Sequence, residues 1–243
     1  MKVVSIHQPN YLPWLGFIAK IACSDIYIVL DNVQYSKSNW HSRTRYSTSE
    51  GLKFLSLAVC SKGVVTEGTP IKDIYLANRL MPKKHFKTLQ QRYCKRPGWP
   101  LIASRFEEVM CKDYEKMLDV CWATIQFTLE IFQLRPQVYF ASQLPCDGNK
   151  TDLVLSLTQA VQGDHYLSGA GAKEYLIPAS FEAQGVGVSF QEFTHPVWPQ
   201  STQRAFEPAA FALEWFIEEP DEAVKKFHEH LRQNPQQPPR CFQ

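Results

Sequence analysis

Short apolar runs alternate with amphipathic segments along most of the chain. Residues 2–6 and 26–30 are rich in β-branched and aromatic side chains, which favours two buried strands. Between them, residues 13–23 carry apolar side chains at helical spacing, and Pro13 suits the start of a helix. This order predicts parallel strands joined by a right-handed crossover, with the functional loop at the carboxyl end of the first strand.

The same alternation continues downstream. The pattern predicts further strands at 53–59, 71–76, 138–141 and 186–190, and helical spacing over 103–135, 152–161 and the region near 209–233. Thr151 is the expected cap of the helix at 152–161, and Gly163 its stop. Alternating strands and helices predict an α/β fold whose parallel-sheet core is nucleotide-binding-like, of the nucleotidylyl-transferase or HUP type, with a helical C-terminal portion.

The expected organisation is one α/β domain over residues 1–233, with a helical sub-lobe at about 79–135 and a flexible Pro/Gln-rich tail at 234–243. The aromatic content of 13% supplies too much apolar area for a disordered chain or a coiled coil.

Charge and cysteine usage narrow the function classes. The net charge of +2 argues against a nucleic-acid binder, and the chain lacks the long apolar run needed for membrane insertion. Seven widely spread cysteines without a CxxC pair favour reduced thiols in a cytoplasmic protein. The small net charge arises because a basic stretch at 79–98, which contains no acidic residue, is offset by an acidic patch near 207–222. The basic stretch favours either a solvated helix face or an anionic substrate such as a nucleotide or a nucleotide sugar.

The densest candidate site, His7–Gly16, lies where the first strand passes into the first helix. Such a junction offers free backbone N–H groups to a phosphate, and His7 and Asn10 add polar side chains there. Nucleotidylyl transferases and class I aminoacyl-tRNA synthetases place a His-x-x-His motif at this turn, and here Asn10 takes the place of the second histidine. The alternative interpretation is a turn shaped by Pro9 and Pro13.

A second cluster follows the second strand. Asp31 and Gln34 come just after its carboxyl end, where we expect them beside the first loop. Arg43 and Arg45, two residues apart on an extended segment, could hold a phosphate or carboxylate from one face. Surface arginines in a solvated loop are the alternative, which the nearby Trp40 makes less natural.

Two later segments complete the set. Gly169 and Gly171 would let the backbone approach an anion, with Ser168 and Lys173 adding a hydroxyl and a mobile charge; a tight turn explains the glycines equally well. His195, after the strand at 186–190, is a candidate general base, unless it belongs to a rigid turn bracketed by prolines.

Taken in order, these clusters resemble the WbqC-like family of bacterial proteins. The stretches that carry the resemblance are Ile6–Phe17, Ser24–Tyr35, Asn39–Arg45, His85, Tyr93, Tyr166–Leu176 and His195–Gln200. After Pro208 the chain departs from the family, because Ala209–Trp215 replaces a Leu-Ser-Ile-Leu-Asp-like helix. The resemblance implies a gene neighbourhood of surface-polysaccharide synthesis, including O-antigen, and the transfer of a glycyl or other aminoacyl group to an amino sugar.

The sequence and the resemblance together favour a transferase or amide ligase that joins an aminoacyl or acyl group to an amine. An adenylating ligase of the pantothenate-synthetase kind would activate the carboxylate with ATP, in the presence of Mg²⁺, and no metal site formed by the protein is predicted. The expected catalytic residues are His7, Asn10, Lys173 and His195. The expected substrate- or nucleotide-binding residues are Gln8, Tyr11, Trp14, Asp31, Gln34, Asn39, Trp40, Arg43, Arg45, Ser168, Gly169, Gly171 and Gln200.

Two alternatives stay open. One is nucleotidylyl transfer onto a sugar phosphate, and the other is a non-catalytic protein that binds a glycan or a nucleotide through Tyr11, Trp14 and Trp40. The transferred group, the acceptor and the oligomeric state do not follow from the sequence.

Overall fold

A computed structural model of the chain describes residues 1–37, 39–60, 67–200 and 205–233. Within these residues the central layer is a parallel sheet with the strand order β5-β2-β1-β6-β7. Its strands are β1 (Val3–His7), β2 (Ile26–Val29), β5 (Gln137–Phe140), β6 (His165–Ser168) and β7 (Gly187–Phe190). The predicted α/β fold with a parallel-sheet core is therefore confirmed.

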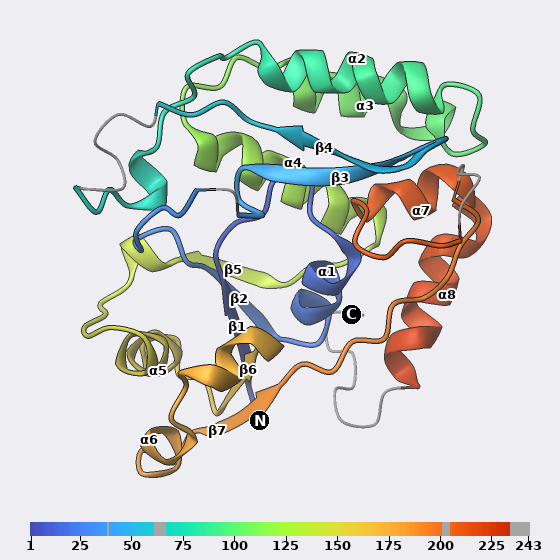
Figure 1. The fold of residues 1–243 in the computed structure, drawn as a ribbon. Coiled ribbons are helices and arrows are strands. Elements are labelled where there is room, and N and C mark those ends of the chain that lie inside the picture. Colours follow the sequence, from blue (N-terminus) through green and yellow to red (C-terminus); the bar gives the residue numbers. More distant parts are fainter. Residues whose placement is uncertain (38, 61–66, 201–204, 234–243) are drawn as a thin grey trace.

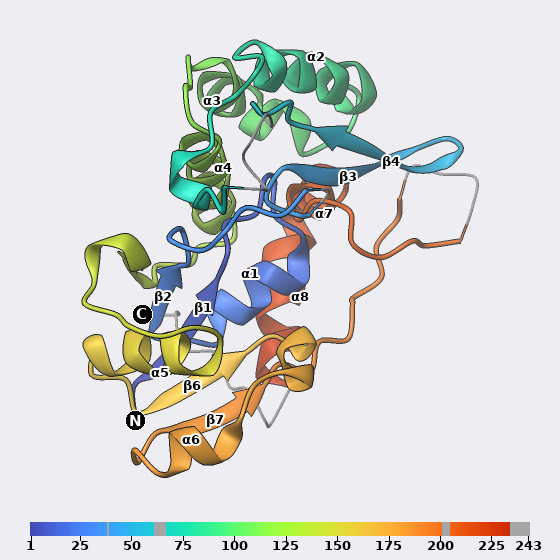
Figure 2. The ribbon, with the colours of Figure 1, turned by 60° about the vertical axis from the view of Figure 1, so that its left-hand side comes forward.

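Helices cover both faces of this sheet (Figures 1 and 2). Val4, Ile6 and Ile28 pack in a core with α5 (Thr151–Ala160) and α6 (Pro178–Glu182). Tyr27 and Val29 belong to the core on the other face, with α1 (Leu15–Ala22) and α8 (Pro220–Arg232). Because both faces are covered, β1 and β2 read as continuous apolar runs in the sequence.

The chain reverses its direction of winding between β1 and β6. From β1 it passes through α1 to β2 and on to β5, whereas β6 and β7 pair on the opposite side of β1. In open α/β sheets, this switch point leaves a crevice at the carboxyl ends of the two strands, and ligands bind there.

A second layer lies above those strand ends in Figure 1. It contains the antiparallel hairpin of β3 (Arg43–Thr48) and β4 (Gly51–Ser56), with α2 (Met81–Tyr93), α3 (Trp99–Cys111), α4 (Met117–Ile131) and α7 (Leu213–Glu218). Phe86, Trp99 and Phe106 lie at the centre of its apolar core. The backbone N–H of Tyr11 donates to the carbonyl of Trp40 over 3.0 Å and joins this layer to the loop after β1.

Several predicted elements need correction. The strand expected at 53–59 is β4, but it pairs within the hairpin and not in the central sheet. The prediction of a strand at 71–76 is wrong. Residues Ile71–Asp73 form the 3-10 turn η1, and Tyr75 and Leu76 after it form only isolated bridges. The helical stretch at 103–135 is divided between α3 and α4. The backbone around residues 115–117, where α4 begins, forms hydrogen bonds with the segment 74–76. The N–H of Leu76 donates to the carbonyl of Glu115, and the N–H of Met117 donates to the carbonyl of Ile74.

Two further differences have local causes. Thr151 begins α5 and does not cap it, because its hydroxyl accepts the backbone N–H of Ile177 over 3.2 Å. The helical region near 209–233 is divided into α7 and α8 at Pro220, which cannot donate the backbone hydrogen bond that would continue α7.

The short elements η2 (Ala141–Gln143) and η3 (Ala170–Glu174) follow β5 and β6 directly. No helix in the described part of the chain has the length and apolar character needed to cross a membrane. The tail expected at 234–243 lies outside the described residues, and the single domain with a sub-lobe at about 79–135 stays a prediction.

Candidate functional site

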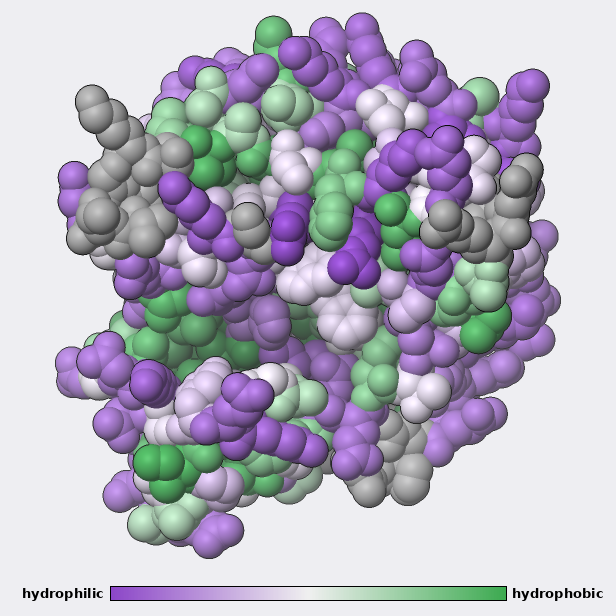
Figure 3. All heavy atoms as spheres, viewed as in Figure 1, coloured by the Kyte–Doolittle hydropathy of each residue, from purple (hydrophilic) through white to green (hydrophobic). Residues whose placement is uncertain are grey.

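A cavity of about 340 Å³ lies at the carboxyl ends of β1 and β6, at the switch point of the sheet. This volume is within the range of about 300–1,000 Å³ typical of small-molecule sites. Its lining residues are Ile6, His7, Gln8, Asn10, Lys20, Leu30, Asn39, Trp40, Val154, Tyr166, Ser168, Gly169, Gly171, Ala172 and Tyr175. Figure 3 shows this face of the molecule hollowed between the layer of η3 and α5 and the layer of the β3–β4 hairpin.

His7 is the last residue of β1, and its imidazole is held in one tautomer. Nδ1 lies 2.8 Å from the carbonyl oxygen of Gln8, and since a carbonyl can only accept, Nδ1 carries the hydrogen. Burial, and secondarily the nearby Lys20, lower the pKa of His7 to about 3. The ring also packs edge-on against Phe17. The imidazole is therefore neutral near pH 7, and its Nε2 is a hydrogen-bond acceptor.

Asn10 contributes a donor that has no partner among the described residues. Its side chain is 2% exposed and lines the cavity, and its Nδ2 makes no hydrogen bond in the described structure. A tight turn at Leu12, two residues later, positions Asn10. Leu12 has a φ of 43°, and its N–H donates to Thr124 Oγ1 over 3.1 Å. A buried unpaired amide is costly, which is typical of a group that a ligand satisfies.

Lys20 is the residue that the sequence analysis missed. It lies on α1, every residue of which is buried, and its side chain lines the cavity beside His7. Nζ donates to the carbonyl of Ile6 over 3.1 Å, and burial lowers the pKa of Lys20 to about 7. One signal could have identified it: Lys20 is the single charged residue in the otherwise apolar run of 15–22. Lysine is rarely buried, so a lysine within a run that packs on all sides indicates a special role.

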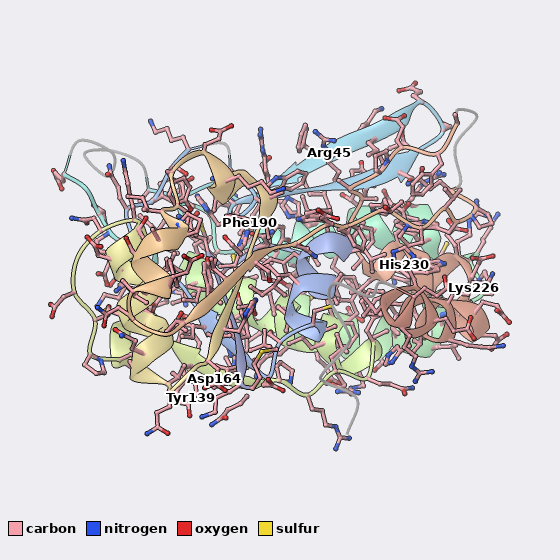
Figure 4. The ribbon with its side chains drawn as sticks, turned by 90° about the horizontal axis from the view of Figure 1, so that it is seen from below. Arg45, Tyr139, Asp164, Phe190, Lys226 and His230 are labelled. Carbon is pink, nitrogen blue, oxygen red and sulfur yellow. The ribbon has the colours of Figure 1, made fainter. Side chains whose placement is uncertain are left out.

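The loop after β6 forms one wall of the cavity, as predicted for Ser168, Gly169 and Gly171. Ser168 is fully buried and its hydroxyl donates to the Tyr166 hydroxyl over 3.3 Å. Lys173 is not among the lining residues. It is exposed, and its ammonium group lies 5.6 Å from the ring centre of Phe190, which ends β7 and is labelled in Figure 4.

Asn39 and Trp40 line the opposite wall, and the predicted arginines lie behind them. Arg45 stacks over Trp40 at 5.3 Å, and both Arg43 and Arg45 stack over Phe54 of β4. The two arginines thus share one face of β3, as their spacing predicts. They do not line the cavity itself; Arg45 contacts Trp40, which does.

Other predicted residues lie apart from the cavity and have partners of their own. The carboxylate of Asp31 accepts the backbone N–H and the hydroxyl of Ser142, at 2.9 and 2.7 Å, which ties the end of β2 to η2. Gln34 is exposed and lies at a separate shallow pocket beside Tyr35.

Tyr11 and Trp14 shape the site from outside it. The hydroxyl of Tyr11 lies 2.8 Å from His85 Nδ1 in the upper layer. The indole of Trp14 packs on Phe193 and covers Gly16, where a Cβ would lie 2.2 Å from the ring. This contact explains the glycine in the first motif.

His195 and Gln200 form a turn away from the cavity. His195 Nδ1 donates to the carbonyl of Pro196 over 2.9 Å, and Nε2 accepts the N–H of Ala209 over 3.3 Å. Gln200 makes two hydrogen bonds of 2.9 Å to the backbone of Glu207. With both ring nitrogens occupied, His195 has no free nitrogen at the described site, and its role as a base stays a prediction.

A larger cavity, of about 750 Å³, lies at the amino end of β5 against α4 and α8. Two of its polar lining residues have partners of their own, since Glu130 pairs with Arg105 and His228 Nε2 bonds the carbonyl of Phe132. We place the candidate site at the switch point, where a parallel sheet directs its strand ends and where donors lack partners. No group of three or more His, Cys, Asp or Glu side chains in the described ranges is arranged to hold a metal.

The fold and the site together define a class: an α/β protein with a small-molecule cavity at the switch point of a parallel sheet. The chain belongs to the WbqC-like protein family, whose model matches residues 8–226. It is 24% identical over 215 residues to the uncharacterized protein Rv1507c of Mycobacterium tuberculosis, which covers 88% of this chain and 92% of that protein. No solved structure matches the chain significantly.

Proposed function

We propose that this protein is an enzyme that transfers an aminoacyl or acyl group to an amine, with an amino sugar of a surface polysaccharide as the acceptor. The observation that carries the proposal is the composition of the cavity. It combines an unpaired amide donor at Asn10 with a neutral imidazole at His7, and its lining contains no carboxylate. Such a lining suits an anionic substrate and a proton acceptor beside it.

In the proposed reaction, the carboxylate of the acyl donor attacks the α-phosphate of ATP and pyrophosphate leaves. The amine then attacks the acyl carbon of the adenylate, AMP leaves with the bonding electrons, and the proton lost by the amine is released to water. Asn10 Nδ2 would donate to a phosphate oxygen, and His7 Nε2 would accept a hydrogen bond from the attacking amine. The low pKa of His7 favours this accepting role over a role in which a charged imidazole stabilises the reacting phosphate.

The cavity fits the triphosphate better than it fits a protein-bound metal ion. Mg²⁺ prefers oxygen ligands, and the lining offers no carboxylate to it. The metal would therefore enter on the phosphates of ATP, and Lys173, Arg43 and Arg45 stand outside the lining as candidate contacts for a longer substrate. A nucleotide-linked substrate and a cytoplasmic location are parts of the same proposal.

Exchange of labelled pyrophosphate into ATP tests the adenylation step directly. We expect exchange that depends on one carboxylate from a panel of amino acids and simple acids, and a loss of at least about 100-fold in His7→Ala or Asn10→Ala. The matched control is Asn78→Ala in the upper layer, outside the cavity. Absence of exchange with every carboxylate, together with failure to bind ATP, would overturn the proposal.

Nucleotidylyl transfer onto a sugar phosphate is the second candidate, favoured by the place of His7 and Asn10 at the turn after β1. It would release pyrophosphate from ATP or another nucleoside triphosphate without any amine. A third outcome, ligand binding without turnover, would favour a non-catalytic glycan- or nucleotide-binding protein that uses Trp40.

A further inference from the structure

Lys20 is a buried amine for which the described residues provide no counterion. It is 1% exposed, and the one acceptor recorded for its ammonium group is the carbonyl of Ile6, at 3.1 Å. Buried lysines are normally paired with a carboxylate, because an isolated buried charge is poorly solvated. The residues that line the cavity around it include no Asp or Glu. The described site therefore lacks one negative charge.

Two neighbouring features mark where that charge would lie. Asn10 Nδ2, itself buried and without a hydrogen-bond partner in the described part of the chain, lines the same cavity as Lys20. Above the ammonium group, Gly169 has no side chain, and a Cβ built there would lie 3.9 Å from Nζ. The backbone of Gly169 is in an ordinary extended conformation, with a φ of −74°, so the turn does not require glycine. The missing Cβ leaves open the space in front of Nζ.

We propose that Lys20 Nζ and Asn10 Nδ2 together bind a phosphate group of the substrate, in the space between α1 and the Gly169 loop. That the phosphate belongs to a nucleotide rests on the proposed function. The reaction scheme above assigned no role to Lys20, and this proposal supplies one. Lys20 contributes charge from below, and Asn10 contributes a neutral donor from the turn after β1.

Binding of phosphate should be coupled to uptake of a proton by Lys20. Without a ligand, burial lowers the pKa of Lys20 to about 7, and an adjacent phosphate would raise it again. At pH 8 the free amine is mostly neutral and must gain a proton to pair with the phosphate, whereas at pH 6 it already carries that proton. Uptake is thus expected above the pKa of the free protein and not below it.

The other titratable groups at the cavity do not change charge between pH 7 and 9. Burial lowers the pKa of His7 to about 3 and that of His41, behind it, below its ordinary value. Burial raises the pKa of Tyr166 to about 12, and it also raises the pKa of Tyr175 and Tyr27. A proton taken up in this range is therefore assigned to Lys20.

Titration calorimetry of the full chain in two buffers of different ionisation enthalpy measures this proton. With pyrophosphate and ATP as probes, we expect uptake of roughly 0.9 proton at pH 8 and roughly 0.1 at pH 6, after subtracting the protons of each probe. Lys20→Met should weaken both probes about 10- to 100-fold and abolish the uptake. Lys84→Met, which removes an exposed lysine on α2, is the matched control.

Gly169→Ala tests the same space with Lys20 intact. A methyl group 3.9 Å from Nζ fits the free protein, so the fold should persist while both probes bind at least about 10-fold more weakly. Unchanged binding in Lys20→Met, or binding by the wild type at pH 8 without uptake, would overturn the proposal. Proton-linked binding of acetate but not pyrophosphate would overturn the phosphate assignment. Proton-linked pyrophosphate binding without pyrophosphate exchange would contradict only the adenylation scheme.

Discussion

Lys20 lies among apolar side chains on a fully buried helix of the central layer, and its burial destabilises the protonated protein. All of α1 is buried, and the pKa of Lys20 falls from 10.5 to about 7. This change corresponds to roughly 5 kcal/mol of lost stability below pH 7, where the amine is protonated in both the folded and the unfolded state. A structural role alone gives no reason to keep such a group, whereas an anion-binding role does.

Removing the amine should therefore stabilise the free protein near neutral pH. The folded pKa of Lys20 is below its unfolded value, so the destabilisation is fully present below pH 7 and is relieved as pH rises toward 10.5. At pH 7 we expect Lys20→Met to have a free energy of unfolding a few kcal/mol higher than that of the wild type, which denaturant unfolding measures as a higher midpoint concentration. The wild type should recover by up to about 1.4 kcal/mol per pH unit above pH 7. Parallel stability profiles of the two proteins from pH 6.5 to 9 would contradict the buried, perturbed amine.

Sequence reasoning found the residues whose chemistry is visible in a local motif. His7, Gln8 and Asn10 follow directly on a predicted strand, and all three line the cavity. Lys20 lies within an amphipathic pattern in which any lysine is first interpreted as solvent-facing. Its burial depends on the covering of α1 by other parts of the chain, which the pattern does not contain.

The β3–β4 hairpin is fixed over the cavity by a buried carboxylate. Glu214 of α7 is fully buried and accepts the backbone N–H and the hydroxyl of Ser47 and the hydroxyl of Tyr93 on α2, the first at 2.9 Å and the last at 2.6 Å. One side chain thus joins three elements. The acidic patch expected near 207–222 is for this reason not wholly a solvated surface.

Substitution Glu214→Leu should cost about 3 kcal/mol of unfolding free energy, because it leaves buried hydroxyl groups with poorer partners. Glu214→Gln keeps an acceptor and should cost about 1 kcal/mol. Urea unfolding monitored by fluorescence measures both, with Glu229→Gln on the exposed side of α8 as the control. A change below about 0.5 kcal/mol in Glu214→Leu would show that the network does not hold the hairpin.

At the scale of elements, the sequence predicted the central strands better than the second layer. Apolar runs locate β1 and β2 because both strands are buried on both faces, and they also locate β5 and β7, which are the partly buried edge strands of the sheet. The segment at 71–76 is also rich in Ile, Tyr and Leu but forms a turn, because its backbone bonds to the 115–117 segment and not to the sheet. Composition alone does not distinguish these two kinds of partner.

At the scale of the whole molecule, the described residues form a five-stranded parallel sheet and a layer that covers its carboxyl ends. The cavity therefore has walls from β1, α1, the loop after β6 and the loop before β3. A ligand that contacts all of these segments would bind only the folded state, and it would stabilise the molecule as a unit.

ATP should accordingly raise the melting temperature. At a free concentration of 100 times its Kd, the expected stabilisation is about 2.7 kcal/mol. For a chain of this length, that corresponds to a rise of about 5–10 °C. Differential scanning calorimetry with ATP and with AMP at pH 8 measures it, and Lys20→Met should show a smaller shift at the same concentrations. No shift with any nucleotide would contradict a nucleotide site.

Local interactions determine the features that the sequence revealed by itself. Hydrophobic periodicity and turn residues indicated the α/β class, the strand–helix–strand start and the turn that carries His7 and Asn10, because each depends on neighbours within a few residues. Tertiary structure alone decided that Trp40 and Ser168 meet that turn, that His195 and Asp31 do not, and that Lys20 is buried without a counterion. Those outcomes depend on the packing of segments far apart in the chain, which sets both the distances between side chains and their access to water.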